Sequence, residues 1–260
     1  MSMDSLLANA PDNIQIPPSR RIENEFEHLY FLLRQKEQRI YTDEELLRLP
    51  DIGAEHPHFR EWLVRKQSSY HLISHLKSKA TQLNILEIGC GNGWLSSGLS
   101  SISGSKVVGL DVNLRELTHA ARVFYKISNL QFIHEDIRSG ILKDERFDII
   151  VFAASIQYFR DVREILNLAV DHLNPKGELH IIDSPFYKEG DQVAAVKRSI
   201  AYYSALGFPE MSNHYFHHVI GTLNDFPFQI IDRQGSLWQK VFGAKNPFPW
   251  ICIKKDSFSN

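Results

Sequence analysis

Residues 84–95, with the sequence NILEIGCGNGWL, join a predicted strand to a predicted helix through a glycine loop. Glycine permits a sharp backbone turn and a close approach to a ligand, and the unpaired N–H groups at the start of the helix favour a polar or anionic group. The loop therefore predicts a nucleotide-like ligand. Its glycines stand at 89, 91 and 93, with Trp94 next, so the spacing is G-x-G-x-G and differs from the G-x-G-x-x-G of dinucleotide-binding folds.

Around this loop, from residue 81 onward, short apolar runs alternate with segments of helical character. The predicted strands are 84–88, 106–110, 130–134, 147–153 and 178–183, followed by 228–233 and 250–254. The predicted helices are 94–101, 114–125, 162–172 and 193–205, and a turn is predicted at 174–177, before the fifth strand. Such alternation predicts an α/β fold built from βαβ units with a parallel sheet. The strands are nearly continuous in apolar residues, which indicates helices on both faces of the sheet.

The first 80 residues show helical periodicity and no strand signal. Residues 1–20 are polar and interrupted by proline, and predict a loose arm. Helices are predicted between Arg21 and Arg48, where Thr42 would cap the second of two, and over 58–79. Aromatic residues at helical spacing in this region predict packing rather than a pocket: Phe26, Tyr30, Phe59 and Trp62. The predicted organisation is a helical N-terminal extension or cap over 1–80 and an α/β domain over 81–260.

The composition is that of a globular protein with no strong charge. The chain has 260 residues, of which 43% are hydrophobic, and a formal net charge of −2, so no basic field for nucleic acid is expected. It shows no signal-peptide pattern at its start and no run of eighteen apolar residues, which predicts a cytoplasmic protein without a membrane span. The two cysteines, Cys90 and Cys252, suit a reducing compartment and are interpreted as space-filling residues.

Further acidic motifs follow the glycine loop in order. Glu87–Gly93 has the form E-x-G-x-G-x-G, Asp111 ends the second predicted strand, and Asp136 follows the third. With the segments 147–151 and 173–179, these motifs resemble those of class I S-adenosylmethionine-dependent methyltransferases, over roughly residues 80–185. The resemblance implies a Rossmann-like, seven-stranded, mostly parallel sheet flanked by helices, with the last strand pair antiparallel. It also implies S-adenosyl-L-methionine as the cofactor.

The resemblance places the cofactor against the loop and the strand ends. Asp111 would accept hydrogen bonds from both ribose hydroxyls, and Asp136 would take the adenine amino group or else cap the following turn. Glu87 would contact the methionine amino group or brace the loop, and Arg65 would hold the methionine carboxylate or else be an exposed helical arginine. The predicted cofactor-binding residues are Glu87, Gly89, Cys90, Gly91, Gly93, Asp111, Val112, Asp136, Ile137, Ala153 and Arg65.

The methyl acceptor leaves a weaker signal. Methyl transfer from a sulfonium is an in-line displacement that depends mainly on positioning, although an oxygen or nitrogen acceptor can need a general base. In the family the reacting methyl faces the segments after the fourth and fifth strands, so the candidate acceptor contacts or bases are Tyr158, Asp183, Tyr187 and His214. Asp183 would otherwise cap a strand end, and Tyr158 would otherwise cover the adenosine. The catalytic residues stay unknown.

The segment 154–159 lacks the N/D-P-P-Y/F pattern of enzymes that methylate DNA bases or protein glutamine. The predicted function is therefore methyl transfer to a small molecule, with the accepting atom and the oligomeric state open. The alternatives are a non-catalytic protein that binds S-adenosylmethionine or S-adenosylhomocysteine, and an NAD-type oxidoreductase.

A histidine-rich stretch at 207–218 invites a metal interpretation, because His214 and His218 are four residues apart, as on one face of a helix. No acidic residue accompanies them at ligand spacing, so no metal site is predicted. Two interpretations of this stretch remain: a lid that faces the substrate, or a packed helix.

Overall fold

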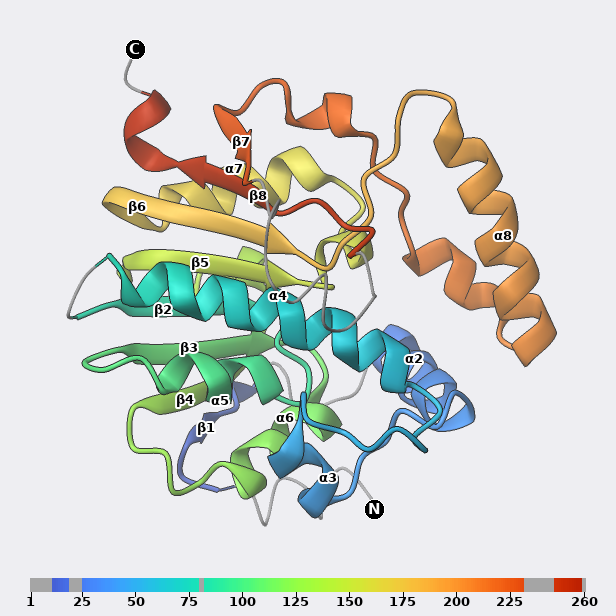
Figure 1. The fold of residues 1–260 in the computed structure, drawn as a ribbon, viewed down its shortest axis with the longest axis horizontal. Coiled ribbons are helices and arrows are strands. Elements are labelled where there is room, and N and C mark those ends of the chain that lie inside the picture. Colours follow the sequence, from blue (N-terminus) through green and yellow to red (C-terminus); the bar gives the residue numbers. More distant parts are fainter. Residues whose placement is uncertain (1–10, 19–24, 80–81, 232–245, 259–260) are drawn as a thin grey trace.

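A computed structural model describes residues 11–18, 25–79, 82–231 and 246–258. They form one eight-stranded sheet in the order β1-β4-β3-β2-β5-β6-β8-β7 (Figure 1). The strands are β1 Ile14–Gln15, β2 Asn84–Ile88, β3 Lys106–Asp111, β4 Leu130–His134, β5 Phe147–Ala153, β6 Leu173–Ile182, β7 Phe228–Ile230 and β8 Ile251–Lys254. The first six strands in the chain pair in parallel, and β8 pairs antiparallel with both β6 and β7. The predicted α/β class, parallel core and antiparallel last pair are confirmed.

The sheet has one strand more than the seven that were predicted, and the additional strand is β1. Ile14 pairs with Phe132 of β4, and the Phe132 N–H donates to the carbonyl of Asn13 at 2.8 Å. The prediction of a loose arm without strand signal is therefore wrong at residues 14–15. Two residues are too few to show a strand period, and their pairing depends on the edge of β4, which is distant in the sequence. Of the rest of the predicted arm, residues 1–10 and 19–20 lie outside the described residues.

The turn predicted at 174–177 is also placed differently. Strand β6 begins at Leu173 and runs through this segment, with a register shift, because Phe147 pairs with Leu173 but Ile149 pairs with Glu178. Lys176 has a positive φ of 67°, and Asn174 donates to the Asp148 carboxylate at 2.8 Å. The turn-forming residues are present, but they make an irregularity inside the strand instead of a boundary before it.

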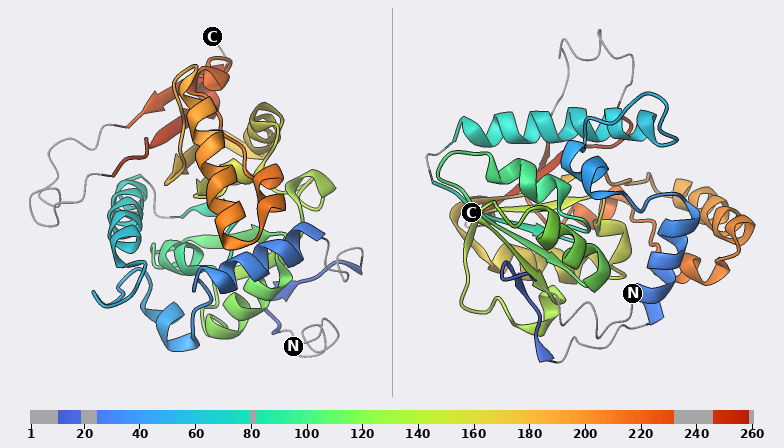
Figure 2. Two further views of the ribbon diagram at one scale, coloured as in Figure 1. Left: turned by 90° about the vertical axis from the view of Figure 1, so that its right-hand side faces the viewer. Right: turned by 90° about the horizontal axis from the view of Figure 1, so that it is seen from below.

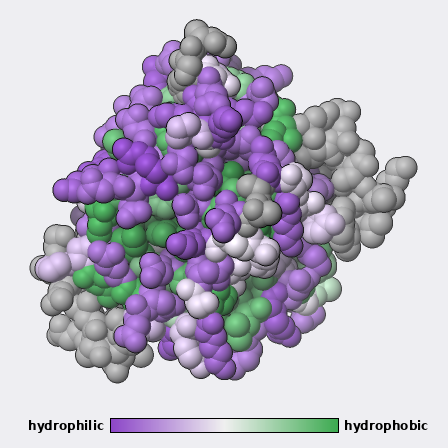
Figure 3. All heavy atoms as spheres, turned by 90° about the vertical axis from the view of Figure 1, so that its left-hand side faces the viewer, coloured by the Kyte–Doolittle hydropathy of each residue, from purple (hydrophilic) through white to green (hydrophobic). Residues whose placement is uncertain are grey.

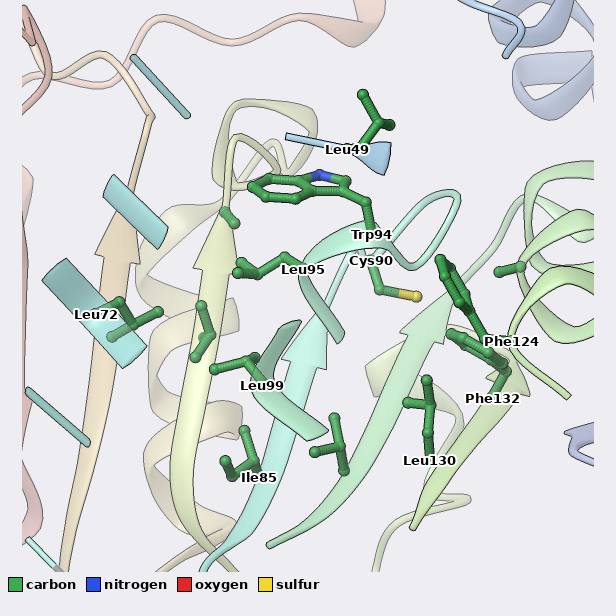
Figure 4. Packing of buried hydrophobic residues seen from close by; sticks show 14 of the residues in the cluster. Leu49, Leu72, Ile85, Cys90, Trp94, Leu95, Leu99, Phe124, Leu130 and Phe132 are labelled. Atoms are coloured by element: carbon green, nitrogen blue, oxygen red, sulfur yellow. The ribbon is translucent and has the colours of Figure 1, made fainter. Parts of the chain in front are cut away.

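Helices cover both faces of the sheet, as predicted. One face carries α4 (Phe59–Lys77), α5 (Trp94–Ser100) and α6 (Leu114–Val123), and the other carries α7 (Val162–Asp171) (Figures 1 and 2). Alternate residues of β2 separate the two cores: Ile85 lies in the cluster with α4 and α5, and Leu86 in the cluster with α7. Figure 4 shows part of the first cluster, which includes Ile85 together with Leu72, Leu95 and Leu99.

The three N-terminal helices lie at different places relative to the sheet. Helix α3 (Asp43–Arg48) begins at a capping box, in which Thr42 accepts from Glu45 N–H and the Glu45 side chain accepts from Thr42 N–H, so the predicted cap is confirmed. Helix α4 packs against the sheet. Helix α2 (Glu25–Lys36) instead lies beyond the carboxyl ends of the strands and contacts the 3-10 helix η4 (Pro209–His214). The division of the chain at residue 80 stays a prediction.

The two ends of the sheet differ in what covers them. At the carboxyl ends, α8 (Asp191–Leu206) projects beside α2, and Leu33, Tyr203 and Met211 form a small buried cluster between them (Figures 1 and 2). The opposite side of the molecule carries mainly hydrophilic residues with apolar patches among them (Figure 3). Within the described ranges, none of the helices combines the length and the apolar character needed to cross a bilayer.

Helix α4 belongs to the main core, which makes a direct stability prediction. Leu76 on α4 is 0% exposed, whereas Leu47 on α3 is 62% exposed. We expect Leu76→Ala to lower the free energy of unfolding by about 2–5 kcal/mol, because it leaves a cavity against the sheet, and Leu47→Ala to change it by less than about 0.5 kcal/mol. Urea denaturation of both variants measures this. Equal effects would show that α4 is not part of the cooperative core.

Candidate cofactor-binding and active site

The glycine loop turns between β2 and α5 with three glycines at positive φ: 74° at Gly89, 53° at Gly91 and 72° at Gly93. Its position is held by backbone hydrogen bonds, since the N–H of Gly89 donates to the Leu110 carbonyl at 2.8 Å. A Cβ on Gly89 would lie 2.5 Å from Cβ of Ser155, and one on Gly93 would lie 2.7 Å from the Phe132 ring. These positions require glycine because of φ and because neighbouring chain segments come so close.

Asp111, at the end of β3, ties the loop to the next strand. Its Oδ2 accepts from the Gly91 N–H at 2.7 Å, and its Oδ1 accepts from the Asn113 N–H at 2.8 Å. Burial raises the pKa of the carboxyl, and the backbone N–H groups act in the opposite direction. Each carboxylate oxygen has a second acceptor position, so Asp111 can hold the loop and still accept hydrogen bonds from a diol.

A cavity of about 320 Å³ opens at the carboxyl ends of the strands. Its size is that of a small-molecule site. Six of the predicted cofactor-binding residues line it: Gly89, Gly91, Asp111, Val112, Asp136 and Ile137. Aromatic side chains form much of the remaining wall: Phe26, Tyr30, Tyr158, Phe159 and His214.

A second, smaller cavity of about 70 Å³ adjoins the first, and both are lined by Tyr30, Gly89, Gly91 and Ala154. It contains four further predicted residues, Arg65, Glu87, Cys90 and Ala153. Of the eleven predicted cofactor-binding residues, ten therefore line one of the two adjoining cavities, and Gly93 lines neither. Gly93 is needed for the close packing of the loop on Phe132 instead.

Comparison with known proteins agrees with this geometry. A model of the family described as methyltransferase domain matches residues 85–177, which include the whole glycine loop, Asp111 and Asp136. Over residues 85–177 the chain thus matches a methyltransferase domain, and solved methyltransferase structures share its fold. The family's cofactor is S-adenosylmethionine, and the two cavities fit such an elongated ligand: they share a glycine floor that any Cβ would obstruct, and carboxylates and arginines lie in their walls.

Individual relatives match over part of their length. Malonyl-[acyl-carrier protein] O-methyltransferase of Bacillus cereus is 29% identical over 120 residues, which cover 45% of this chain and 44% of that protein. Ubiquinone biosynthesis O-methyltransferase of Rickettsia felis is 24% identical over 121 residues, covering 45% of each. The chain thus spans less than half the length of these curated relatives. The structure of magnesium protoporphyrin IX methyltransferase from Synechocystis PCC 6803 with bound SAH superposes with a TM-score of 0.55, at 13% identity, over 86% of this chain and 93% of that one, and shows the same fold.

Two acidic residues of the methyltransferase domain have structural partners as well as cavity positions. Asp136 caps the 3-10 helix η2 (Ile137–Ser139) by accepting from the Arg138 N–H at 2.9 Å, and it pairs with the Arg138 guanidinium at 3.0 Å. Glu87 is buried and accepts from Ser96 Oγ at 2.5 Å, which links β2 to α5. Burial raises the pKa of Glu87 to about 8. Both bracing roles considered from the sequence are therefore present, beside a cofactor role that stays a prediction.

Three arginines from the N-terminal part of the chain line the smaller cavity: Arg34 of α2, Arg39 of the loop that follows it, and Arg65 of α4. Arg39 and Arg65 share the Glu61 carboxylate, at 2.6 Å and 2.9 Å, and after the opposing cost of burial these partners lower the pKa of Glu61 to about 2. The Arg65 side chain is only 18% exposed. The interpretation of Arg65 as an exposed helical arginine is therefore wrong, because Glu61 and the Trp62 ring hold it against the cavity.

Helix α2 contributes residues that sequence reasoning assigned to packing alone. Phe26 and Tyr30 pack on Tyr158, with ring centroids 6.2 Å and 5.6 Å away, and the same two side chains also line the larger cavity. Trp62 of α4 likewise lines the smaller one. The helical period predicted a buried face but could not show that this face lies over strand ends. Arg34 and Glu116 were missed altogether, since charged residues on amphipathic helices are expected to face water.

The four acceptor candidates separate into two pairs. Tyr158 and His214 line the larger cavity. Asp183 and Tyr187 are not among the residues that line either described cavity: Asp183 accepts from Ser68 Oγ at 2.5 Å, and Tyr187 packs on His217. Burial raises the pKa of Tyr158, so its phenol keeps its proton near neutral pH.

The histidine-rich stretch does not form the helical face on which the metal interpretation depended. The 3-10 helix η4 ends at His214, and the chain is extended at Tyr215. His218 is buried, and its Nε2 lies 3.3 Å from the Ile156 carbonyl. His214 instead packs on Phe26, with ring centroids 5.0 Å apart. These contacts make the stretch part of the aromatic cover beside the cavity.

Among the described residues, one group of three side chains has the spacing of metal ligands: His75, Glu178 and His180. Lys79 Nζ donates to Glu178 Oε1 at 2.6 Å, and Trp250 Nε1–H donates to His180 Nδ1 at 3.1 Å, which leaves the proton of the neutral imidazole on Nε2, the nitrogen nearest Glu178. A cation already neutralises the carboxylate, and a protonated nitrogen cannot bind a metal. The contacts describe a hydrogen-bonded network between α4 and β6.

The raised pKa of Glu87 makes a pH prediction for the protein without cofactor. Between about pH 5.5 and 7.5 the native carboxyl keeps a proton that the unfolded chain has released, so this group should lower the free energy of unfolding by about 1.4 kcal/mol per pH unit. We expect Glu87→Gln to remove that slope, and Glu44→Gln on exposed α3 to leave it. Chemical denaturation at several pH values measures the slopes, and parallel curves for wild type and Glu87→Gln would contradict the prediction.

Proposed function

We propose that the chain is an S-adenosylmethionine-dependent methyltransferase that acts on a small molecule. The observation that carries this proposal is the pair of adjoining cavities on the glycine loop, in which the predicted cofactor residues meet Tyr158 and His214. A cofactor against the loop would thus lie within reach of side chains from the segments that follow the strands. That is the arrangement methyl transfer requires.

Methyl transfer requires the protein mainly to align the acceptor with the methyl group and to exclude water from the site. Holding the acceptor in line with the methyl group contributes up to about 7–11 kcal/mol in well-oriented systems, and excluding water strengthens the electrostatic interactions inside the site. Phe26 and Tyr30 on one side, and Tyr158 and His214 on the other, supply an aromatic cover suited to both tasks. His214 is our candidate for a base where the acceptor carries a proton.

The acceptor is proposed as a small molecule, free or attached to a carrier. The named relatives are O-methyltransferases, of malonyl-[acyl-carrier protein] and of ubiquinone biosynthesis, which favours an oxygen acceptor here. The net charge of −2 does not favour nucleic acid. A cytoplasmic location stays a prediction.

Binding is tested by thermal shift with S-adenosylmethionine, S-adenosylhomocysteine and NAD. A ligand at about 100 times its dissociation constant stabilises the fold by about 2.7 kcal/mol, so both sulfur compounds should raise Tm and NAD should not. Asp111→Asn should reduce this shift by more than half, because the ribose acceptor loses its charge, while Asp144→Asn on an exposed loop should not. A shift with NAD alone would overturn the proposed cofactor.

Catalysis is tested by transfer of a labelled methyl group to acceptors in a cell extract. Tyr158→Ala should slow labelling at least about tenfold, equivalent to ~1.4 kcal/mol, because the cover over the cavity is opened. Tyr187→Ala, at a residue that lines neither of the two cavities, should change it less than about threefold. Binding of the cofactor without any labelled product would favour the non-catalytic alternative.

A further inference from the structure

Glu116 is a carboxylate in the cofactor cavities that neither the sequence motifs nor the proposed reaction explains. It lies in the first turn of α6, three residues after the Asn113 cap, and it lines the smaller cavity with Glu87 and Arg34. Its Oε2 stands 2.5 Å from the position a Cβ on Gly91 would take. The absence of a side chain at Gly91 is what admits this carboxylate over the loop.

Charged and polar groups from several elements affect the pKa of the Glu116 carboxyl. Burial is the main effect and raises its pKa to about 7. Asp111 of β3 acts in the same direction, whereas Arg34 of α2, Arg65 of α4 and a hydrogen bond from the Asn92 backbone act against it. Near neutral pH, a positive charge arriving in the cavities can therefore change the protonation of this carboxyl.

The two other carboxylates that lie beside the glycine loop, Asp111 and Glu87, are less free to respond. Asp111 is already held by two backbone N–H groups, and Glu87 accepts from Ser96 and has a pKa of about 8. The carboxyl of Glu116 accepts a hydrogen bond from the Asn92 backbone. It is thus the carboxylate whose charge is most easily set by what occupies the cavities.

S-adenosylmethionine and its product differ in one charge. The methyl donor is a sulfonium cation, and the product is an uncharged thioether. A carboxylate several ångströms away in a poorly solvated cavity stabilises the cation by far more than it would in water. We propose that Glu116 is a specificity-determining residue, whose ionised carboxylate favours S-adenosylmethionine over S-adenosylhomocysteine. The attraction would end when the methyl group leaves, which helps the product to be exchanged.

This inference rests on the proposed function through the cofactor alone, so it is tested by binding. Isothermal titration with each of the two sulfur compounds, at about pH 6 and pH 8, gives the ratio of their dissociation constants. In the wild type, the preference for S-adenosylmethionine should rise about fivefold or more with pH, as Glu116 becomes ionised. In Glu116→Gln the preference at pH 8 should fall by a similar factor and its rise should be smaller. The amino group of each free ligand titrates in the same way whichever protein is present, so it does not contribute to the difference between wild type and Glu116→Gln.

Glu44→Gln, on an exposed part of α3, is the matched control and should behave as the wild type. An equal loss of both ligands in Glu116→Gln, or an unchanged ratio, would overturn the inference, because the residue would then only support the loop. If the variant does not fold, titration of the wild type near pH 7 in two buffers of different ionisation enthalpy decides: S-adenosylmethionine must release more protons than S-adenosylhomocysteine. Failure of both compounds to bind the wild type would overturn the proposed function itself.

Discussion

The carboxylate of Asp111 is the interaction on which the site depends. By accepting the Gly91 N–H at 2.7 Å and the Asn113 N–H at 2.8 Å, it joins the glycine loop after β2 to the segment that starts α6. These two segments belong to neighbouring parallel strands, so one side chain sets the spacing between the floor and one wall of the cavities. Without this carboxylate, these two part-buried backbone N–H groups would lose the partner that each now has.

Charge is distributed around this joint in a way that suits a cationic ligand. Three carboxylates line the cavities beside the loop: Glu87 of β2, Asp111 of β3 and Glu116 of α6. Arginines from α2 and α4 line the smaller cavity. Burial raises the pKa of all three acids. The pKa values of Glu87 and Glu116, about 8 and about 7, lie close enough to neutral pH for a cationic ligand of the proposed kind to favour their ionised forms.

Residues from the N-terminal part of the chain contribute both to the core and to the cavity wall. Leu72 and Leu76 of α4 lie in the same core cluster as the first strands, and β1 extends the sheet beyond β4. Helix α2 reaches the other end of the molecule and covers the cavity with Phe26 and Tyr30. The same region therefore stabilises the sheet on one face and closes the site at its edge.

The local chemistry of the chain determined the α/β class, the parallel core, the capping box at Thr42 and the identity of the loop, because glycine spacing, apolar runs and cap residues act over a few neighbouring positions. The resemblance of the glycine and acidic motifs to a methyltransferase family pointed to ten residues that line the two cavities. Tertiary structure alone decided what depends on distant segments meeting. The pairing of Ile14 with β4, the position of Phe26 and Tyr30 over the strand ends, and the burial of Glu116 beside Arg34 all arise from contacts between residues far apart in sequence. No local pattern encodes such contacts, since the same helix face can pack on a core or close a site.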